Sequence, residues 1–183
     1  MFKLRVPERI INHCKNQVAL YNFGQRSFAN GSQDQQLTGI IGQCVLMELF
    51  GWPLIDGATG CDGGFDIVFK SLRIDVKTMG RTTDVRPYYV NNFLAVQFGF
   101  DNDLYIFCSL NKNKNELTVC GWLPKDKFTE KAKYYPKGTI RTRSDGTTFP
   151  TFADLYEIVN ADLYDVDSFE DMVNSIQDYY RVL

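Results

Sequence analysis

The alternating stretch at residues 65–78 constrains the fold of this chain more than any other. Two runs rich in apolar and β-branched residues, 65–69 and 72–78, flank the polar pair Lys70-Ser71, and glycines lie just outside them. This pattern is typical of a β-hairpin with a two-residue turn. Such a turn predicts the strand register: Phe69 opposite Leu72, Val68 opposite Arg73, Ile67 opposite Ile74, and Asp66 opposite Asp75.

The predicted register sorts the hairpin residues into two faces, because successive side chains of a strand point to opposite sides of the sheet. One face is apolar and is expected to meet the core: Ile67, Phe69, Leu72, Ile74 and Val76. The other carries Asp66, Val68, Arg73, Asp75 and Lys77. Carboxylates directly across a ladder have Cβ atoms about 5 Å apart and repel each other. Such an arrangement requires a compensating cation, and a divalent metal is the obvious candidate.

These residues resemble a known signature. Asp66, followed by Asp75-Val76-Lys77 on the next strand, resembles the signature of the PD-(D/E)XK nucleases, although Phe65 stands where that signature has proline. Upstream, the run Gly39-Ile-Ile-Gly42-Gln43 resembles the G-x-x-G-E helix that precedes the hairpin in many members. The resemblance covers roughly residues 36–122. It implies an α/β protein with a mixed central β-sheet flanked by helices, the restriction-endonuclease-like fold.

The resemblance also implies a metal site. Asp66, Asp75 and the backbone carbonyl of Val76 would bind Mg²⁺ or Mn²⁺, which take oxygen ligands and leave positions open for water and phosphate. Lys77 would orient the attacking water and offset negative charge on the phosphate. Gln43 stands where the family usually has glutamate. Its amide oxygen is still a hard ligand, but one negative charge is lost and metal affinity should fall.

Two other carboxylates are alternatives for the site. Glu48 follows Gln43 by five residues, which places it about 140° around the helix, so both cannot point at one metal ion. We therefore favour Gln43 and interpret Glu48 as a solvated or core-edge residue. Asp62, in the glycine-rich approach to the hairpin, is a weaker candidate for a second metal.

Length and composition predict one domain spanning residues 1–183, with a substantial core rich in its 14 Phe and 10 Tyr. No apolar run approaches the roughly 20 residues of a membrane span, and the N-terminus is not a signal peptide, so we expect no membrane association and a cytoplasmic location. Five widely spaced cysteines indicate neither a zinc site nor a disulfide framework. A single histidine, His13, leaves the chemistry to carboxylates, lysine and water.

The net charge of −2 argues against a protein that coats nucleic acid without selectivity, but the charges are unevenly distributed. Residues 125–143 carry seven basic and two acidic side chains, whereas residues 151–183 carry eight acidic and one basic. The basic segment, with its tyrosines, suits contact with phosphates and bases, although a solvated surface is an equally open interpretation. The predicted nucleic-acid contacts are Lys133, Lys137, Arg141, Arg143 and Arg81.

Periodicity and turn residues predict the remaining elements. Helices are expected at about 7–23, 36–50 and 124–133, and a final amphipathic helix starts near Asp167 or Ser168, within an acidic C-terminal helical extension at 151–183. Strands are expected at 104–110 and 116–123, and residues 88–97 are either strand or helix. Loops are expected at 79–86, beside the site, and at 133–150, the latter a long loop or hairpin that turns at Asp145-Gly146.

Three functions remain open at this stage. The leading one, implied by the resemblance, is a metal-dependent nuclease acting on DNA. The second is a nuclease-like fold that no longer cuts and binds nucleic acid or protein, which Gln43 in place of glutamate favours. The third is a regulatory protein that binds a partner through its acidic C-terminal third. A homodimer would suit an enzyme that cuts both strands.

Overall fold

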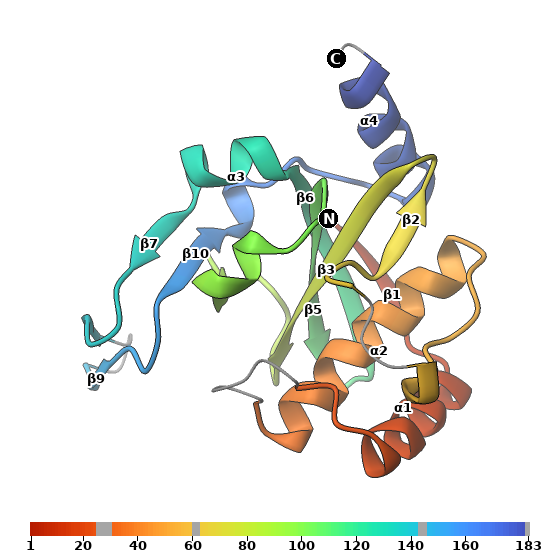
Figure 1. The fold of residues 1–183 in the computed structure, drawn as a ribbon, viewed down its shortest axis with the longest axis horizontal. Coiled ribbons are helices and arrows are strands. Elements are labelled where there is room, and N and C mark those ends of the chain that lie inside the picture. The colour runs from red at the N-terminus through yellow and green to blue at the C-terminus, as the bar shows by residue number, and fades with distance from the viewer. Residues whose placement is uncertain (25–30, 60–62, 143–145, 182–183) are drawn as a thin grey trace.

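The computed structural model describes residues 1–24, 31–59, 63–142 and 146–181. Its centre is a five-stranded sheet of order β1-β6-β5-β3-β2 (Figure 1). The bounds of these strands are β1 Phe2–Arg5, β2 Ile67–Phe69, β3 Leu72–Arg81, β5 Leu104–Asn111 and β6 Glu116–Pro124. Strands β3 and β5 are parallel and the other neighbours are antiparallel. The predicted α/β class with a mixed central sheet is confirmed, whereas the restriction-endonuclease-like fold stays a prediction.

Helices and two smaller sheets surround the central sheet. The helices are α1 Glu8–Leu20, α2 Gln33–Leu49, α3 Lys125–Lys131 and α4 Phe169–Arg181, with short 3₁₀ turns η1 Gly57–Thr59, η2 Ala95–Gly99 and η3 Asn160–Asp162. A three-stranded sheet has the order β4-β10-β7, with β4 Val90–Leu94, β10 Leu155–Val159 and β7 Lys133–Tyr135. The hairpin of β8 Ile140–Thr142 and β9 Thr148–Pro150 lies at the end of an arm that extends away from the central sheet (Figure 1).

The β2–β3 hairpin has the predicted turn and three of the four predicted residue pairs. Lys70 and Ser71 both have positive φ, 47° and 73°, as a two-residue turn that matches the twist of its strands requires. The pairs Phe69–Leu72, Val68–Arg73 and Ile67–Ile74 form as expected. The Lys70 ammonium also donates a hydrogen bond to the Gln177 side chain of α4, over 2.6 Å.

Helix α2 packs against β3 at a glycine. Its first turn has a capping box, in which Ser32 and Gln35 each accept a backbone N–H of the other, so the helix begins three residues earlier than expected. A methyl group built on Gly42 would lie 2.0 Å from Oγ1 of Thr78, whereas one on Gly39 meets nothing within 4 Å. Gly42 therefore sets the distance between helix and sheet.

Two clusters of side chains cover opposite faces of the sheet. The first contains Ile74 and Val76 of β3 together with residues of α1, α2 and α4, including the fully buried Met172 and Ile176 of the predicted amphipathic helix. The second is aromatic, and Phe128 of α3 lies at its centre. Ring centroids 5.0 to 6.3 Å from that of Phe128 belong to Phe93, Phe98, Tyr105, Phe107 and Tyr156.

Several elements differ from the sequence-based expectations. Strand β3 continues to Arg81, through part of the segment expected as a loop, because its whole second half pairs with β5. Residues 88–97 divide between β4 and η2. The C-terminal extension is not purely helical, because β10 pairs with β4 and β7, and β1 was not anticipated. The predicted turn at Asp145 falls outside the described residues.

The cysteines and the helices of the described residues bear on the redox state and on membrane insertion. Cys14, Cys44, Cys108 and Cys120 are buried free thiols, and Cys61 lies outside the described residues. Among the helices of the described residues, none is both long and apolar enough to cross a bilayer.

The contact at Gly42 predicts opposite effects for two substitutions in one helix. Gly42→Ala forces α2 away from Thr78 and should lower the free energy of unfolding by about 1–3 kcal/mol. Gly39→Ala has open space around the new methyl group and should raise it by up to about 1 kcal/mol through helix propensity. Urea denaturation of both variants measures the difference, and equal effects would contradict the packing described.

The positive φ of Ser71 in the β2–β3 turn predicts that a glycine there stabilises the protein. Ser71→Gly removes the cost of a left-handed conformation at a residue with a Cβ atom and should stabilise the protein by about 0.5–1 kcal/mol. Ser32→Gly is the matched control, because Ser32 has φ −71° and caps α2, so its replacement should cost a few tenths of a kcal/mol. Thermal denaturation compares them. A melting temperature that falls for Ser71→Gly would contradict this prediction.

Candidate active site

Asp75 and Lys77 form a shielded ion pair on one face of β3. Oδ2 of Asp75 lies 2.7 Å from Nζ of Lys77, and the lysine side chain is only 12% exposed. The same Nζ lies 5.2 Å from the ring centroid of Phe93 in β4, within range of a cation–π interaction. Opposite charges interact more strongly where water is excluded, so this environment holds both side chains in place.

Asp66 is anchored beside this pair, but not directly across from Asp75. Its backbone N–H donates to the carbonyl of Ile74 over 2.8 Å, and its Oδ2 accepts the N–H of Val76 over 2.6 Å. The carboxylate thereby takes the place of a backbone carbonyl, and the ladder ends at the Ile67–Ile74 pair. The predicted Asp66–Asp75 ladder pair is therefore wrong, although Asp66 remains bound to the residue that separates Asp75 from Lys77.

The two helical candidates occupy different environments. Gln43 is buried in α2, which packs on the face of β3 opposite Lys77. Its approach to the carboxylates stays a prediction. Glu48 is exposed and pairs with Arg9 over 2.5 Å, which confirms its interpretation as a surface residue.

Two further polar residues lie near Asp75, and the sequence did not reveal them. Tyr105 is the neighbour of Asp75 in the parallel β3–β5 pairing, and Asn102 precedes β5. Both side chains are buried. Burial and the charge of Asp75 raise the pKa of Tyr105 well above its usual range. No sequence pattern could indicate them, because Tyr105 belongs to a run of core residues.

Mg²⁺ is the ion that the resemblance implies for this face of β3, and its binding stays a prediction. The described residues contain no group of three or more His, Cys, Asp or Glu side chains that converge on one point, and Asp62 lies outside them. Mg²⁺ is commonly held by one or two carboxylates with water and neutral oxygens. Asp66 and Asp75 are two carboxylates in this part of the structure, and their role as metal ligands stays a prediction.

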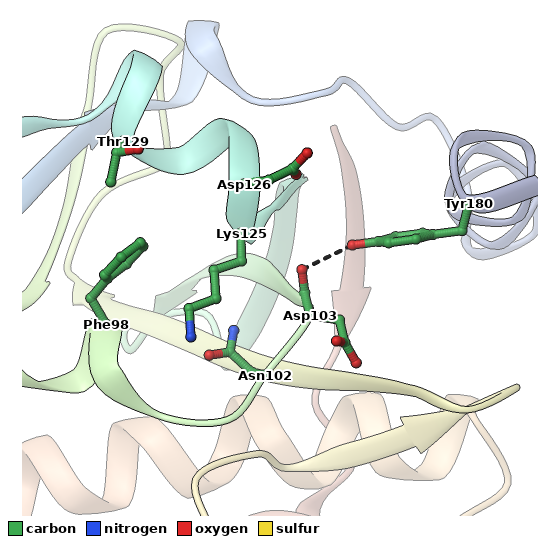
Figure 2. Close-up of a pocket in the computed structure, with 7 residues that line it drawn as sticks. All are labelled: Phe98, Asn102, Asp103, Lys125, Asp126, Thr129 and Tyr180. Carbon is green, nitrogen blue, oxygen red and sulfur yellow. Dashed lines mark hydrogen bonds between the residues drawn. The ribbon is translucent and has the colours of Figure 1, made fainter. Parts of the chain in front are cut away.

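A pocket of about 440 Å³ opens near this cluster, between η2, α3 and α4 (Figure 2). It is lined by Phe98, Asn102, Asp103, Lys125, Asp126, Thr129 and Tyr180. Oη of Tyr180 donates to the backbone carbonyl of Asp103 over 2.9 Å, which joins α4 to the start of β5 (Figure 2). Although burial favours its neutral form, hydrogen bonds from Arg73 hold the pKa of Asp103 below its usual range.

The predicted nucleic-acid contacts divide into engaged and exposed groups. Arg81 donates a hydrogen bond to the carbonyl of Val90 over 2.6 Å, which connects β3 to β4. Burial lowers the pKa of its guanidinium group. Arg141 pairs with both carboxylate oxygens of Glu157, over 2.7 and 2.8 Å. Lys133 and Lys137 are exposed on the arm, and Arg143 lies outside the described residues. The role of these five residues stays a prediction.

Comparison of the chain with protein-family models, curated proteins and solved structures gave no match. Function is therefore inferred from the geometry around Asp75 and Lys77.

Proposed function

We propose that this protein is a metal-dependent nuclease that hydrolyses phosphodiester bonds, with DNA as its substrate. The observation that carries the proposal is the 2.7 Å contact between Asp75 and Lys77, beside a second carboxylate, Asp66, that is fixed by the Val76 N–H. Phosphodiester hydrolysis needs a positioned water and stabilisation of developing negative charge. Two carboxylates next to a lysine ammonium group can supply both.

Each residue has a defined part in this proposal. Asp66 and Asp75 hold Mg²⁺, which when bound neutralises charge on the scissile phosphate. Lys77 orients the attacking water and offsets charge on the phosphate oxygens from a shielded position. The carboxylate of Asp66 is held in place by the hydrogen bond that it accepts from the Val76 N–H.

A nuclease-like binding module that does not cut is the second candidate. Two observations favour it: the Lys77 side chain is mostly buried, and α2 carries the uncharged Gln43 in place of glutamate. In such a module the Asp75–Lys77 pair would serve the fold alone. A titration with Mn²⁺ separates the candidates, because the module should show no saturable site that depends on Asp66.

The nuclease proposal predicts that a substitution with little effect on stability abolishes cleavage. Asp66→Asn keeps an oxygen to accept the Val76 N–H but removes the charge, so the melting temperature in EDTA should change little. Mg²⁺-dependent cleavage of plasmid and single-stranded DNA should fall by about 10²-fold or more, as it should for Lys77→Met. EDTA should remove the activity of the wild type.

Replacement of a surface ion pair is the control for this experiment. Asp34→Asn removes the charge of an exposed carboxylate that lies 2.5 Å from Nζ of Lys112. This ion pair joins the start of α2 to the end of β5, so its loss should leave cleavage unchanged. Wild-type protein that fails to cut either DNA with Mg²⁺ or Mn²⁺, or that cuts as fast as Asp66→Asn, would refute the nuclease assignment.

A further inference from the structure

The arm that extends away from the central sheet gathers exposed apolar side chains (Figure 1). Its described residues are 133–142 and 146–154. Among the described residues of the whole chain, eight large apolar side chains are exposed, and four of them lie in this arm: Tyr134, Ile140, Phe149 and Phe152. Single apolar residues are normal on a protein surface, but a group of them on one protruding element indicates a binding surface.

Backbone hydrogen bonds join the two parts of the arm, the β7–β10 ladder and the β8–β9 hairpin. At this junction the N–H of Lys137 donates to the Asp154 carboxylate over 2.7 Å, and the N–H of Gly138 donates to the Thr151 carbonyl over 2.8 Å. Phe152, which is 70% exposed, lies between these two acceptors in the chain. The junction therefore places Phe152 on the segment opposite Lys137.

Basic groups lie beside the aromatic rings of the arm. The guanidinium of Arg141 lies over the ring of Tyr135, 3.8 Å from its centroid, and also pairs with Glu157 of β10. Nζ of Lys133 lies 5.1 Å from the centroid of the same ring. Lys133 and Lys137 are both exposed. The described arm carries three basic residues and one acidic residue, so its surface is basic as well as apolar.

This combination of side chains suits a single strand of nucleic acid better than a protein. Lysine is depleted at protein–protein interfaces. Proteins that bind single strands, in contrast, combine basic groups along the phosphate backbone with aromatic rings on which the bases stack. In a duplex, neighbouring base pairs cover the faces of the bases. Exposed rings can therefore stack only on unpaired bases.

The arm continues from the sheet that covers the candidate active site. Strand β10 pairs with β7 of the arm and also with β4. In the β4–β10 ladder Tyr156 faces Phe93, whose ring centroid lies 5.2 Å from Nζ of Lys77. A DNA strand bound along the arm would thus be held by the same sheet that contacts Lys77.

We propose that the arm binds single-stranded DNA, with a base stacked on the exposed ring of Phe152 and a phosphate against the ammonium group of Lys137. Tyr134 and Lys133 extend this surface along β7 towards the central sheet. The inference rests on the proposed function, to which it adds the substrate class: DNA with unpaired nucleotides.

A binding assay in EDTA tests the arm separately from cleavage. Fluorescence anisotropy measures the affinities of a labelled single-stranded oligonucleotide of mixed sequence and of the duplex of the same length. Phe152→Ser should weaken single-strand binding about tenfold, because it removes one stacking ring. Tyr88→Ser is the matched control and should change neither affinity. Tyr88 is 71% exposed, but it precedes β4 at the end of the β4–β10 ladder away from the arm.

The salt dependence of binding separates stacking from charge. Lys137→Gln should weaken single-strand binding and lower the slope of log affinity against log salt concentration by about 0.7, the value for one phosphate contact on a single strand. Phe152→Ser should leave this slope unchanged, a difference that a general loss of structure would not produce. The melting temperatures of both variants should equal that of the wild type, because both side chains are exposed.

Three results would overturn the inference. The first is single-strand affinity equal to wild type in both variants, and the second is tighter binding of the duplex than of the single strand. The third is a wild-type dimer that dissociates in Phe152→Ser while DNA affinity stays the same, which would assign the arm to a second copy of the chain. Each of these results leaves the nuclease assignment to the cleavage assay with Asp66→Asn, so the two proposals can fail separately.

Discussion

The structure depends on strand β3 being covered on both faces. On one face α2 approaches so closely that Gly42 has no room for a side chain beside Thr78. On the other, Phe93 of β4 lies over Lys77. A strand held between two layers cannot slip by one residue, because a slip would move its apolar side chains and its charged ones to the wrong faces. This constraint positions Asp75 and Lys77 more firmly than their own contact does.

The same constraint determines the chemistry that the site can support. A carboxylate and an ammonium group shielded from water attract each other strongly, but each has lost its hydration. Asp66 joins the group through the Val76 N–H and not through a ladder pair.

The hairpin could be read from the sequence because its information is local. Alternation of apolar and polar residues, with Lys70-Ser71 between the runs, was enough to predict the register and the two faces of β3. The final amphipathic helix was predictable for the same reason, with Met172 and Ile176 in the core. Strands β1 and β10 were missed because each is short and becomes a strand only by pairing with partners far away in the chain.

The amino-acid sequence by itself determined which side chains share a face of β3, because side-chain alternation in a strand is a property of the backbone. Only the tertiary structure decided what meets that face. Phe93 and Tyr105 come from strands far from the hairpin in the sequence, and they lie beside its polar residues Lys77 and Asp75. Likewise Asp66 does not pair with Asp75 in the ladder, because its carboxylate accepts a hydrogen bond from the Val76 N–H. Burial depends on the packing of distant segments, which no local pattern encodes.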